Sequence, residues 1–290
     1  MTRAVISPRI PQALDGAPWI RIFPVRTPTL PPATHTNVYL AGERALTVFD
    51  PASPYDDEQA ALDEALDALA NDGHPVAEIV LTHHHVDHVS GAAHLAERLG
   101  VGVAAHRETA ARVAGRVNVT RLLDEGARLD CGPRGATALF TPGHAPGHLC
   151  FLDEESRAVI AGDMVASTGT IIIEPDDAGD MIAYLASLGR LRGLGARWLL
   201  PAHGPPIADA DALLDFYVAH RLERERRVLA ALSAEPRTVE ELVPPAYPDV
   251  APAIYGLAAR SLLAHLHKLE REGRARKISS SDGSGDRWTL

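Results

Sequence analysis

Cysteine is scarce in this chain, whose 290 residues include only Cys131 and Cys150. Two cysteines cannot form a disulfide framework, and a zinc site built only of thiolates needs more sulfur than they offer. Long apolar runs are missing too. No stretch approaches the roughly 18 residues of a transmembrane helix, and the N-terminal segment lacks the apolar core of a signal peptide. We therefore expect a cytoplasmic protein with no membrane partner.

Two common catalytic motifs are also missing. The sequence has neither the GxSxG of a serine-hydrolase elbow nor the GxxxxGK of a phosphate-binding loop. Aromatic residues make up only 5% of the chain, so few side chains can stack on nucleic-acid bases. Residues 1–210 carry a net charge of −10, whereas residues 211–290 are neutral. An acidic region disfavours non-specific binding to polyanions.

The first 210 residues alternate strand-like and helix-like segments. Apolar or alternating runs predict strands at 19–25, 37–42, 44–50, 77–82, 101–106 and 136–141, a hairpin over 149–163, and a strand followed by a loop over 197–204. Helical periodicity predicts helices at 56–73, 91–100 and 181–195. This order favours helices packed outside sheets, which is a layered α/β fold.

The remaining residues follow another pattern. We expect a long helix over 211–234, a short helix with a capping box formed by Thr238 and Glu241, and a third helix over 254–273. Two short strands around the turn SDGSG then end the chain. Three helices followed by a hairpin are typical of a winged-helix module.

Histidines gather at the end of one predicted strand. Four of the 14 histidines lie within six residues, with a carboxylate among them: His83, His84, His85, Asp87 and His88. They directly follow the apolar strand 77–82 and precede a helix, so they lie on a short loop at a sheet edge. Because imidazole and carboxylate together suit zinc and related metals, we interpret the loop as a metal site rather than a solvated tract.

Three other strand-to-loop junctions each carry one more candidate ligand. These are His144 in TPGH, Asp163 in AGD and His203 in PAHG. A lone histidine at a strand end more often has a structural role. Together with four residues of the histidine loop, however, they give seven candidate ligands, which is enough for two metals.

The motifs THHHVDH, TPGH, GD and PAHG, in this order, resemble those of the metallo-β-lactamase-fold hydrolase superfamily. The resemblance spans roughly residues 20–210 and implies an αββα sandwich with a dinuclear metal site at the edge of its two sheets. In that pattern one metal is held by His83, His85 and His144, the other by Asp87, His88 and His203, and Asp163 bridges them. His84 occupies a variable position and is not a ligand. Residues 50–52 read DPA where many members have Asp-Thr-Gly.

The C-terminal region resembles the lactamase-beta-like subgroup, whose members append a winged-helix module to the hydrolase domain. We therefore assign residues 1–210 to a catalytic domain and 211–290 to a linking helix plus a small winged-helix-like domain. Activities known around the subgroup include a single-strand-selective ribonuclease and an acyl-carrier-protein thioesterase. Tyr217, His220 and Arg221 match the subgroup's helix signature. They either pack the domains together or contact the substrate.

These patterns predict a metal-dependent hydrolase that uses metal-bound hydroxide. We expect two zinc ions, or other divalent transition metals, with Asp87 also orienting the hydroxide and moving its proton. The expected substrate is a small ester, thioester or lactone, free or on an acyl carrier. One alternative is a single-strand-selective endoribonuclease, since residues 260–277 carry a net charge of +4 and could bind RNA. Another is a nucleic-acid-binding regulator with a vestigial metal site. His148 either supports a ligand or only closes its turn.

Overall fold

The computed structural model describes residues 9–279 and 285–290, which form two compact units. The first unit contains the chain up to residue 141 together with residues 147–170 and 195–210. The second contains residues 142–146, residues 171–194 and the chain from residue 211 onward. The domain boundary after residue 210 stays a prediction. The division into two units is not the same as this boundary, because residues 142–146 and 171–194 group with the C-terminal residues. Most of the predicted SDGSG turn lies outside the described residues.

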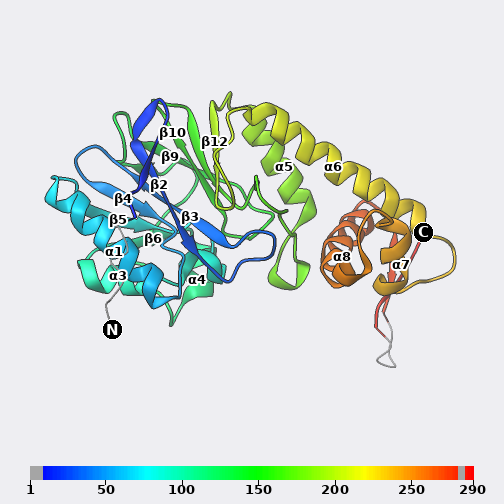
Figure 1. Ribbon diagram of the computed structural model, residues 1–290. Helices are drawn as coiled ribbons and strands as arrows, with labels where there is room; N and C mark the ends of the chain where they lie inside the picture. Colours follow the sequence, from blue (N-terminus) through cyan, green and yellow to red (C-terminus); the bar gives the residue numbers. More distant parts are fainter. Residues whose placement is uncertain (1–8, 280–284) are drawn as a thin grey trace. The chain divides into compact units, whose positions relative to one another are not determined.

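The first unit contains a seven-stranded sheet with its strands in chain order (Figure 1). The strands are β1 (Gln12–Leu14), β2 (Ala17–Arg26), β3 (His35–Ala41), β4 (Leu46–Phe49), β5 (Val76–Val80), β6 (Gly102–Ala105) and β7 (Arg121–Leu122). Strands β1 to β4 pair antiparallel, whereas β4 to β7 pair parallel. Parallel neighbours need long crossovers, and here helices supply them: α1 (Asp56–Asn71), α2 (Val86–Val89), α3 (Ala92–Leu99) and α4 (Arg107–Val113).

A second sheet of five strands has the order β12-β11-β10-β9-β8. Its strands are β8 (Arg128–Leu129), β9 (Ala136–Phe140), β10 (Leu149–Asp153), β11 (Ala158–Gly162) and β12 (Trp198–Pro201). Strands β10 and β11 form the predicted hairpin, and β11 pairs parallel with β12.

Strand β3 shows how the first sheet separates two apolar cores. Val38 and Leu40 face a core shared with helices α1 and α3, which cover that face of the sheet (Figure 1). Tyr39 points to the opposite side, into a core built from both sheets. There Phe49 of the first sheet meets Phe151 of the second, with ring centroids 5.0 Å apart. The period-2 alternation of the strand therefore produces the stacked layers that the sequence predicts.

The second unit contains α5 (Met181–Arg192), α6 (Ala210–Ala231), α7 (Val239–Ala246), α8 (Tyr255–Arg271), β13 (Arg276–Ile278) and β14 (Arg287–Thr289), and α6 begins one residue inside the first unit. Three helices followed by a hairpin are confirmed, as is the capping box of Thr238 and Glu241. The apolar residues of α7 and α8 surround Trp288, which is fully buried. This module therefore has a hydrophobic core of its own.

Several short elements were not expected from the sequence. They are helices α2 and α4 and strands β1 and β7, and none exceeds seven residues. Segments this short complete too few periods to produce a recognisable pattern. Among the residues that the structure describes, no helix combines the length and apolar character that a membrane crossing requires.

Candidate metal centre

The histidine loop leaves the end of β5 and turns directly into α2. His85 is the N-cap residue of this helix and its carbonyl accepts the N–H of His88 at 3.0 Å. The turn brings the rings of His83 and His88 to a centroid separation of 4.0 Å. Nε2 of His83 lies 2.9 Å from Nδ1 of His85. Side chains close in sequence therefore converge here because the chain reverses immediately after the strand.

Asp163 follows β11 and lies among these histidines. A ligand atom from each of His83, His85 and Asp163 falls within 4.8 Å of the others. The residue before Asp163 is Gly162, whose φ of 49° is in the left-handed region. A Cβ atom at this glycine would lie 2.6 Å from Nε2 of His148. Glycine therefore permits both the turn and the close approach that place the carboxylate.

A second group is formed by Asp87, His88 and His203, whose ligand atoms also lie within 4.8 Å of one another. His203 follows β12, and its Nε2 lies 3.5 Å from Oδ2 of Asp87 and 3.5 Å from Oδ1 of Asp163. Nε2 of His88 lies 3.5 Å from the same oxygen of Asp163. Asp163 is therefore shared by the two groups, as a bridging ligand would be.

Two of these imidazoles, those of His88 and His203, are oriented by hydrogen bonds from their Nδ1 atoms. Nδ1 of His88 donates to Oδ2 of Asp50 at 2.8 Å, and Nδ1 of His203 donates to the carbonyl of His35 at 3.0 Å. With Nδ1 protonated, Nε2 of a neutral imidazole keeps a lone pair for a metal. Asp50 also accepts from the backbone N–H and the hydroxyl of Thr82 at 2.7 and 2.6 Å. The DPA strand end therefore anchors the histidine loop.

The charges and burial of the cluster fit a cation. Nε2 of His88 is buried and makes no hydrogen bond to any residue that the structure describes. Burial disfavours the charged form of His88, but the carboxylates of Asp163 and Asp50 outweigh it and raise its pKa well above the usual value. Burial likewise disfavours ionised Asp163, but His203 and His88 lower its pKa well below the usual value. A buried set of nitrogen and carboxylate donors suits a divalent transition metal.

His144 lies on the segment 142–146, which belongs to the second unit. Its side chain is buried, and its Nδ1 donates to the carbonyl of Ile172 at 2.8 Å. The same tautomer argument places a lone pair on its Nε2. Its role as a ligand stays a prediction.

His148 contacts a candidate ligand, so it does more than close its turn. Its Nε2 accepts the backbone N–H of Asp163 at 3.1 Å, so its Nδ1 carries the proton and donates to the hydroxyl of Thr141 at 2.9 Å. His84 is buried beside His85, with ring centroids 4.7 Å apart. The hydroxyl of Thr29 lies 3.4 Å from Nε2 of His203. Sequence reasoning did not identify Thr29, Thr82 or the carbonyl of His35 as supports of the cluster. The adjacency of Thr82 to His83 was the only local signal.

The three signature residues of α6 differ in exposure. Tyr217 and Arg221 are buried, whereas His220 is exposed and stacks on the exposed Phe216 with centroids 6.0 Å apart. Within the second unit, the guanidinium of Arg221 donates to the carbonyl of Ile171. Whether any of them contacts a substrate stays a prediction.

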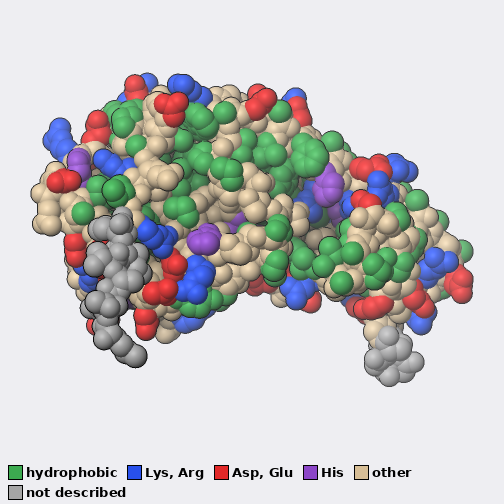
Figure 2. Space-filling model, viewed as in Figure 1, with side chains coloured by type: hydrophobic (Ala, Val, Ile, Leu, Met, Phe, Trp, Pro, Cys, Tyr) green, Lys and Arg blue, Asp and Glu red, His purple; other side chains and the backbone are tan. Residues whose placement is uncertain are grey.

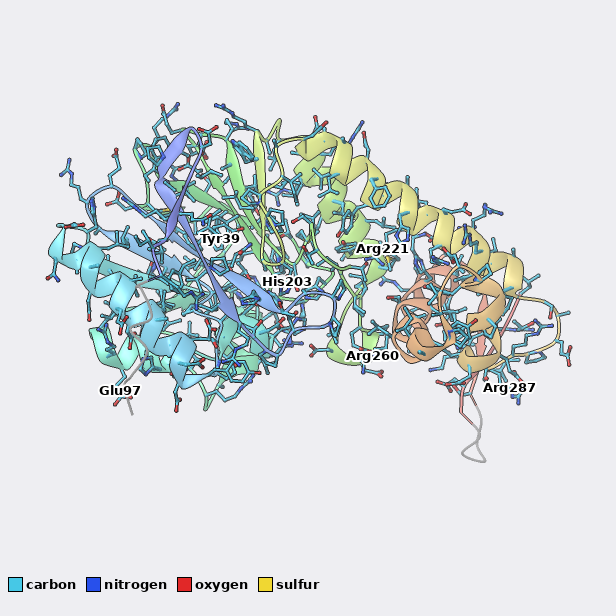
Figure 3. The ribbon with its side chains drawn as sticks, viewed as in Figure 1. Tyr39, Glu97, His203, Arg221, Arg260 and Arg287 are labelled. Atoms are coloured by element: carbon cyan, nitrogen blue, oxygen red, sulfur yellow. The ribbon has the colours of Figure 1, made fainter. Side chains whose placement is uncertain are left out.

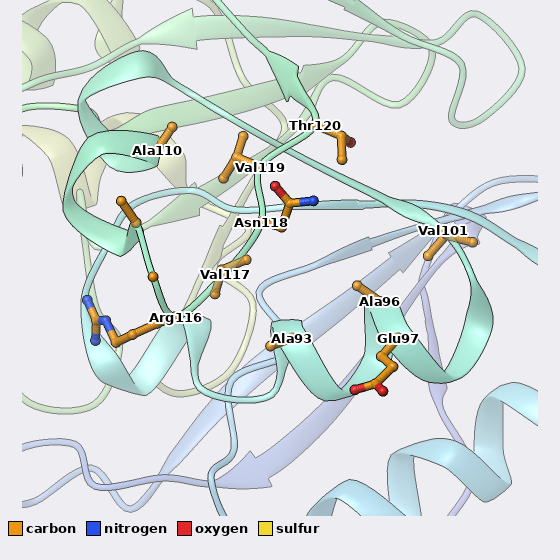
Figure 4. Close-up of a pocket in the computed structure, with 12 residues that line it drawn as sticks. Ala93, Ala96, Glu97, Val101, Ala110, Arg116, Val117, Asn118, Val119 and Thr120 are labelled. Carbon is orange, nitrogen blue, oxygen red and sulfur yellow. The ribbon is translucent and has the colours of Figure 1, made fainter.

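The first unit also has a pocket of about 760 Å³ between α3 and residues 110–120 (Figure 4). Small apolar side chains line it, with Glu97 and Arg116 as its charged members. None of the seven candidate ligands is among its lining residues. It is therefore separate from the histidine cluster.

Two models of known protein families match the chain. The family model described as the metallo-beta-lactamase superfamily matches residues 31–203, and a beta-lactamase associated winged helix domain matches residues 238–288. The chain belongs to the metallo-β-lactamase superfamily. The predicted fold class, an αββα sandwich with a small C-terminal winged-helix domain, is confirmed.

Among curated relatives, the lactamase-like protein vrtG of Penicillium aethiopicum is 30% identical over 263 residues, which cover 89% of this chain and 77% of that protein. A protein of Aspergillus fumigatus named atrochrysone carboxyl ACP thioesterase is 29% identical over 243 residues, covering 81% of this chain and 69% of its own length. These relatives support a metallo-β-lactamase-fold hydrolase with a candidate metal-binding group of histidines and aspartates.

Solved structures agree on the fold. The metallo-beta-lactamase family protein TTHA1429 of Thermus thermophilus has a TM-score of 0.75 and 27% identity, covering 94% of this chain and 98% of that chain. A beta-lactamase domain protein of Burkholderia ambifaria has a TM-score of 0.83 and 23% identity, covering 99% and 95%. TTHA1623, solved in a di-iron-bound form, has a TM-score of 0.50 and 32% identity, covering 65% and 96%. Zinc as the metal and a cytoplasmic location stay predictions.

Proposed function

We propose that this chain is a dinuclear metal-dependent hydrolase of a small ester, thioester or lactone. The observation that carries the proposal is the convergence of imidazole and carboxylate ligand atoms at the strand ends of the first unit, within 4.8 Å in each group. Zinc suits this donor set, as do other divalent transition metals. The di-iron form of the relative TTHA1623 makes iron the first alternative.

The proposed ligands divide into two sets that share Asp163. His83, His85 and His144 would hold one metal, and Asp87, His88 and His203 the other. The covalent chain supports the inclusion of His144. Its five-residue segment is joined at both ends to the first unit, where the N–H of Thr141 donates to the carbonyl of His148 at 3.0 Å. His148 in turn accepts from the N–H of Asp163, so residues of the first unit that flank the segment are linked to the shared carboxylate.

Two divalent metals held by these residues would activate water as hydroxide at neutral pH. The chain itself orients the ligands, because Asp50 and the carbonyl of His35 fix the Nδ1 protons of His88 and His203. Asp87 is the proposed catalytic residue. Its side chain is 15% exposed and not fully buried, so its carboxylate can meet substrate and hold a proton at Oδ1 or Oδ2 during turnover.

A thioester carried by an acyl carrier is the substrate class to test first. The name of the Aspergillus fumigatus relative, an ACP thioesterase, supports this choice. The relatives named above bring no support to the endoribonuclease alternative. Acidic and basic side chains are interspersed over the face drawn in Figure 2, a distribution that does not favour a phosphate backbone. A regulator with a vestigial site would bind metal without turnover.

The experiment is metal analysis of the full chain combined with a substrate panel. We expect two transition-metal ions per chain and chelator-sensitive hydrolysis of a chromogenic thioester. A lactone, a cephalosporin and labelled single-stranded RNA complete the panel. His83→Ala should lose metal, whereas the matched control His94→Ala should keep it, because His94 lies outside the cluster and bonds Asp63 at 2.9 Å. Protein that contains no transition metal would refute the proposal, and hydrolysis of RNA alone would favour the ribonuclease.

A further inference from the structure

The segment that carries His144 is held by one face of α5. The N–H of Asp180, the N-cap residue of α5, donates to the carbonyl of Gly143 at 2.8 Å, and the hydroxyl of Ser187 donates to the carbonyl of Pro142 at 2.8 Å. A Cβ atom at Gly143, whose φ is 135°, would lie 2.2 Å from the backbone nitrogen of Tyr184. Residues 180, 184 and 187 share one helix face, so the segment lies flat against the first turns of α5.

The imidazole of His144 has a separate support. Its Nδ1 donates to the carbonyl of Ile172, and the preceding carbonyl, that of Ile171, accepts from Nη2 of Arg221. The same guanidinium lies over the ring of Tyr184, with its carbon 5.3 Å from the ring centroid. One side chain of α6 (Figure 3) therefore contacts both structures that hold the His144 segment: the neighbouring peptide and α5.

Arg221 is an unusual residue for this place. It is 4% exposed, and it makes no ion pair with any residue that the structure describes; its Nε is buried without a hydrogen bond. A buried charge without a carboxylate partner costs stability. An apolar side chain of similar length would fill the same space at lower cost. Packing alone therefore does not account for an arginine here.

We propose that Arg221 is a positioning residue for His144. By fixing the peptide at residues 171 and 172, it holds the carbonyl that orients the imidazole and keeps its Nε2 directed as a metal ligand. This inference rests on the proposed function, because it takes His144 to be a ligand. It also gives the linking helix of the winged-helix region a part in metal binding.

The same helix offers a matched control. Arg224 is 7% exposed and lies one turn further along α6, but it donates to the carbonyl of Ala246 at 2.9 Å and pairs with Asp249 at 2.9 Å. Its contacts belong to the C-terminal helices and not to residues 171–172. Arg224→Met should therefore destabilise the second unit without changing the orientation of His144.

The experiment measures the affinity of the full chain for Zn²⁺ by chelator competition. Arg221→Met should weaken one of the two zinc sites by about 10- to 100-fold, the usual effect of removing a group that orients a ligand, and leave the other site unchanged. Arg221→Lys keeps the charge and one donor, and should lose about tenfold, the lower end of that range. Arg224→Met should keep both affinities while its melting temperature falls.

A double-mutant cycle isolates the role of His144. If Arg221 acts through His144, Arg221→Met should cause no further loss of zinc affinity in a His144→Ala background. Equal losses in both backgrounds, or an unchanged affinity of Arg221→Met and Arg221→Lys, would overturn the inference. If Arg221→Met does not fold, Arg221→Lys replaces it in the same double-mutant cycle with His144→Ala. Wild-type protein that binds two zinc ions would leave the proposed function intact in either case.

Discussion

A substitution of Asp50 tests how strongly metal binding depends on the groups that form hydrogen bonds with the ligands. The carboxylate of Asp50 is 3% exposed and accepts three hydrogen bonds: from the N–H and hydroxyl of Thr82, and from Nδ1 of His88. Asp50→Asn keeps the shape but replaces one acceptor with an NH₂ group. If that group takes the place of Oδ1, the buried N–H of Thr82 loses its partner, at a cost of about 1–3 kcal/mol. If it takes the place of Oδ2, the imidazole of His88 must accept at Nδ1 and carry its proton on Nε2, where a metal would bind.

The second orientation is the less costly one, because the hydroxyl of Thr82 and the imidazole of His88 can both accept from the NH₂ group, whereas a backbone N–H cannot accept. We expect zinc bound by Asp87, His88 and His203 to lose about 10- to 100-fold in affinity, as is usual when the partner of a ligating histidine is removed. Chelator competition measures the affinity, and thermal unfolding of the metal-free protein measures the stability. An affinity within about threefold of wild type, well below that range, would refute the assignment of Asp50 as the group that orients His88.

Asp153→Asn is the matched control for this change. Asp153 is also a buried carboxylate of the first unit, 5% exposed, and accepts from the N–H and the hydroxyl of Ser156 and from Nε1 of Trp19. It lies at the far end of β10 from His148, five residues or about 17 Å away at about 3.3 Å per residue. Its replacement should lower stability by a similar amount and leave zinc affinity unchanged. Equal losses of zinc affinity in both variants would show that general destabilisation is being measured.

Three further outcomes follow from the same geometry. Asp87→Ala should keep less than about a tenth of wild-type kcat, a loss above about 1.4 kcal/mol; greater residual turnover in steady-state assays would remove Asp87 from the catalytic role. His84→Ala should keep two metals by elemental analysis, although its burial predicts a lower melting temperature; metal loss equal to that of His83→Ala would show that the ligands are misassigned. Metal binding should release protons near neutral pH, because Asp163 and Asp50 outweigh burial and raise the pKa of His88; an indicator dye in weak buffer would detect them, and no release would contradict a protonated imidazole in the metal-free site.

The strand-end ligands could be predicted from the sequence because each lies next to an apolar strand. His83 follows β5, Asp163 follows β11 and His203 follows β12, so a local pattern marks both the element and the residue beyond it. Sheet topology then brings these ends together. Local patterns of this kind need no knowledge of which distant residues meet.

The supports behind the ligands could not be predicted in this way. His88 and Asp50 are 38 positions apart, and the backbone oxygen that orients His203 belongs to a residue 168 positions away. A backbone carbonyl has no sequence signature at all. The grouping of residues 171–194 with the C-terminal helices could not be predicted either, because it depends on pairs of distant residues such as Arg260 and Glu174, 3.1 Å apart. Such pairs appear only when the chain is folded.

Helix α6 lies between these two cases. The helical spacing of its buried residues is present in the sequence, but a search for apolar residues alone does not detect it. The buried residues Leu214, Tyr217, Arg221, Arg224 and Val228 recur at alternating spacings of three and four, which is one helix face. Two of the five are arginines, so the apolar residues by themselves do not form a continuous stripe on this face. Each guanidinium donates to a backbone carbonyl and lies over a tyrosine ring, and that of Arg224 also pairs with Asp249. On α6 both core-facing arginines therefore hold a buried carbonyl, and at Arg221 that carbonyl adjoins the one that orients His144.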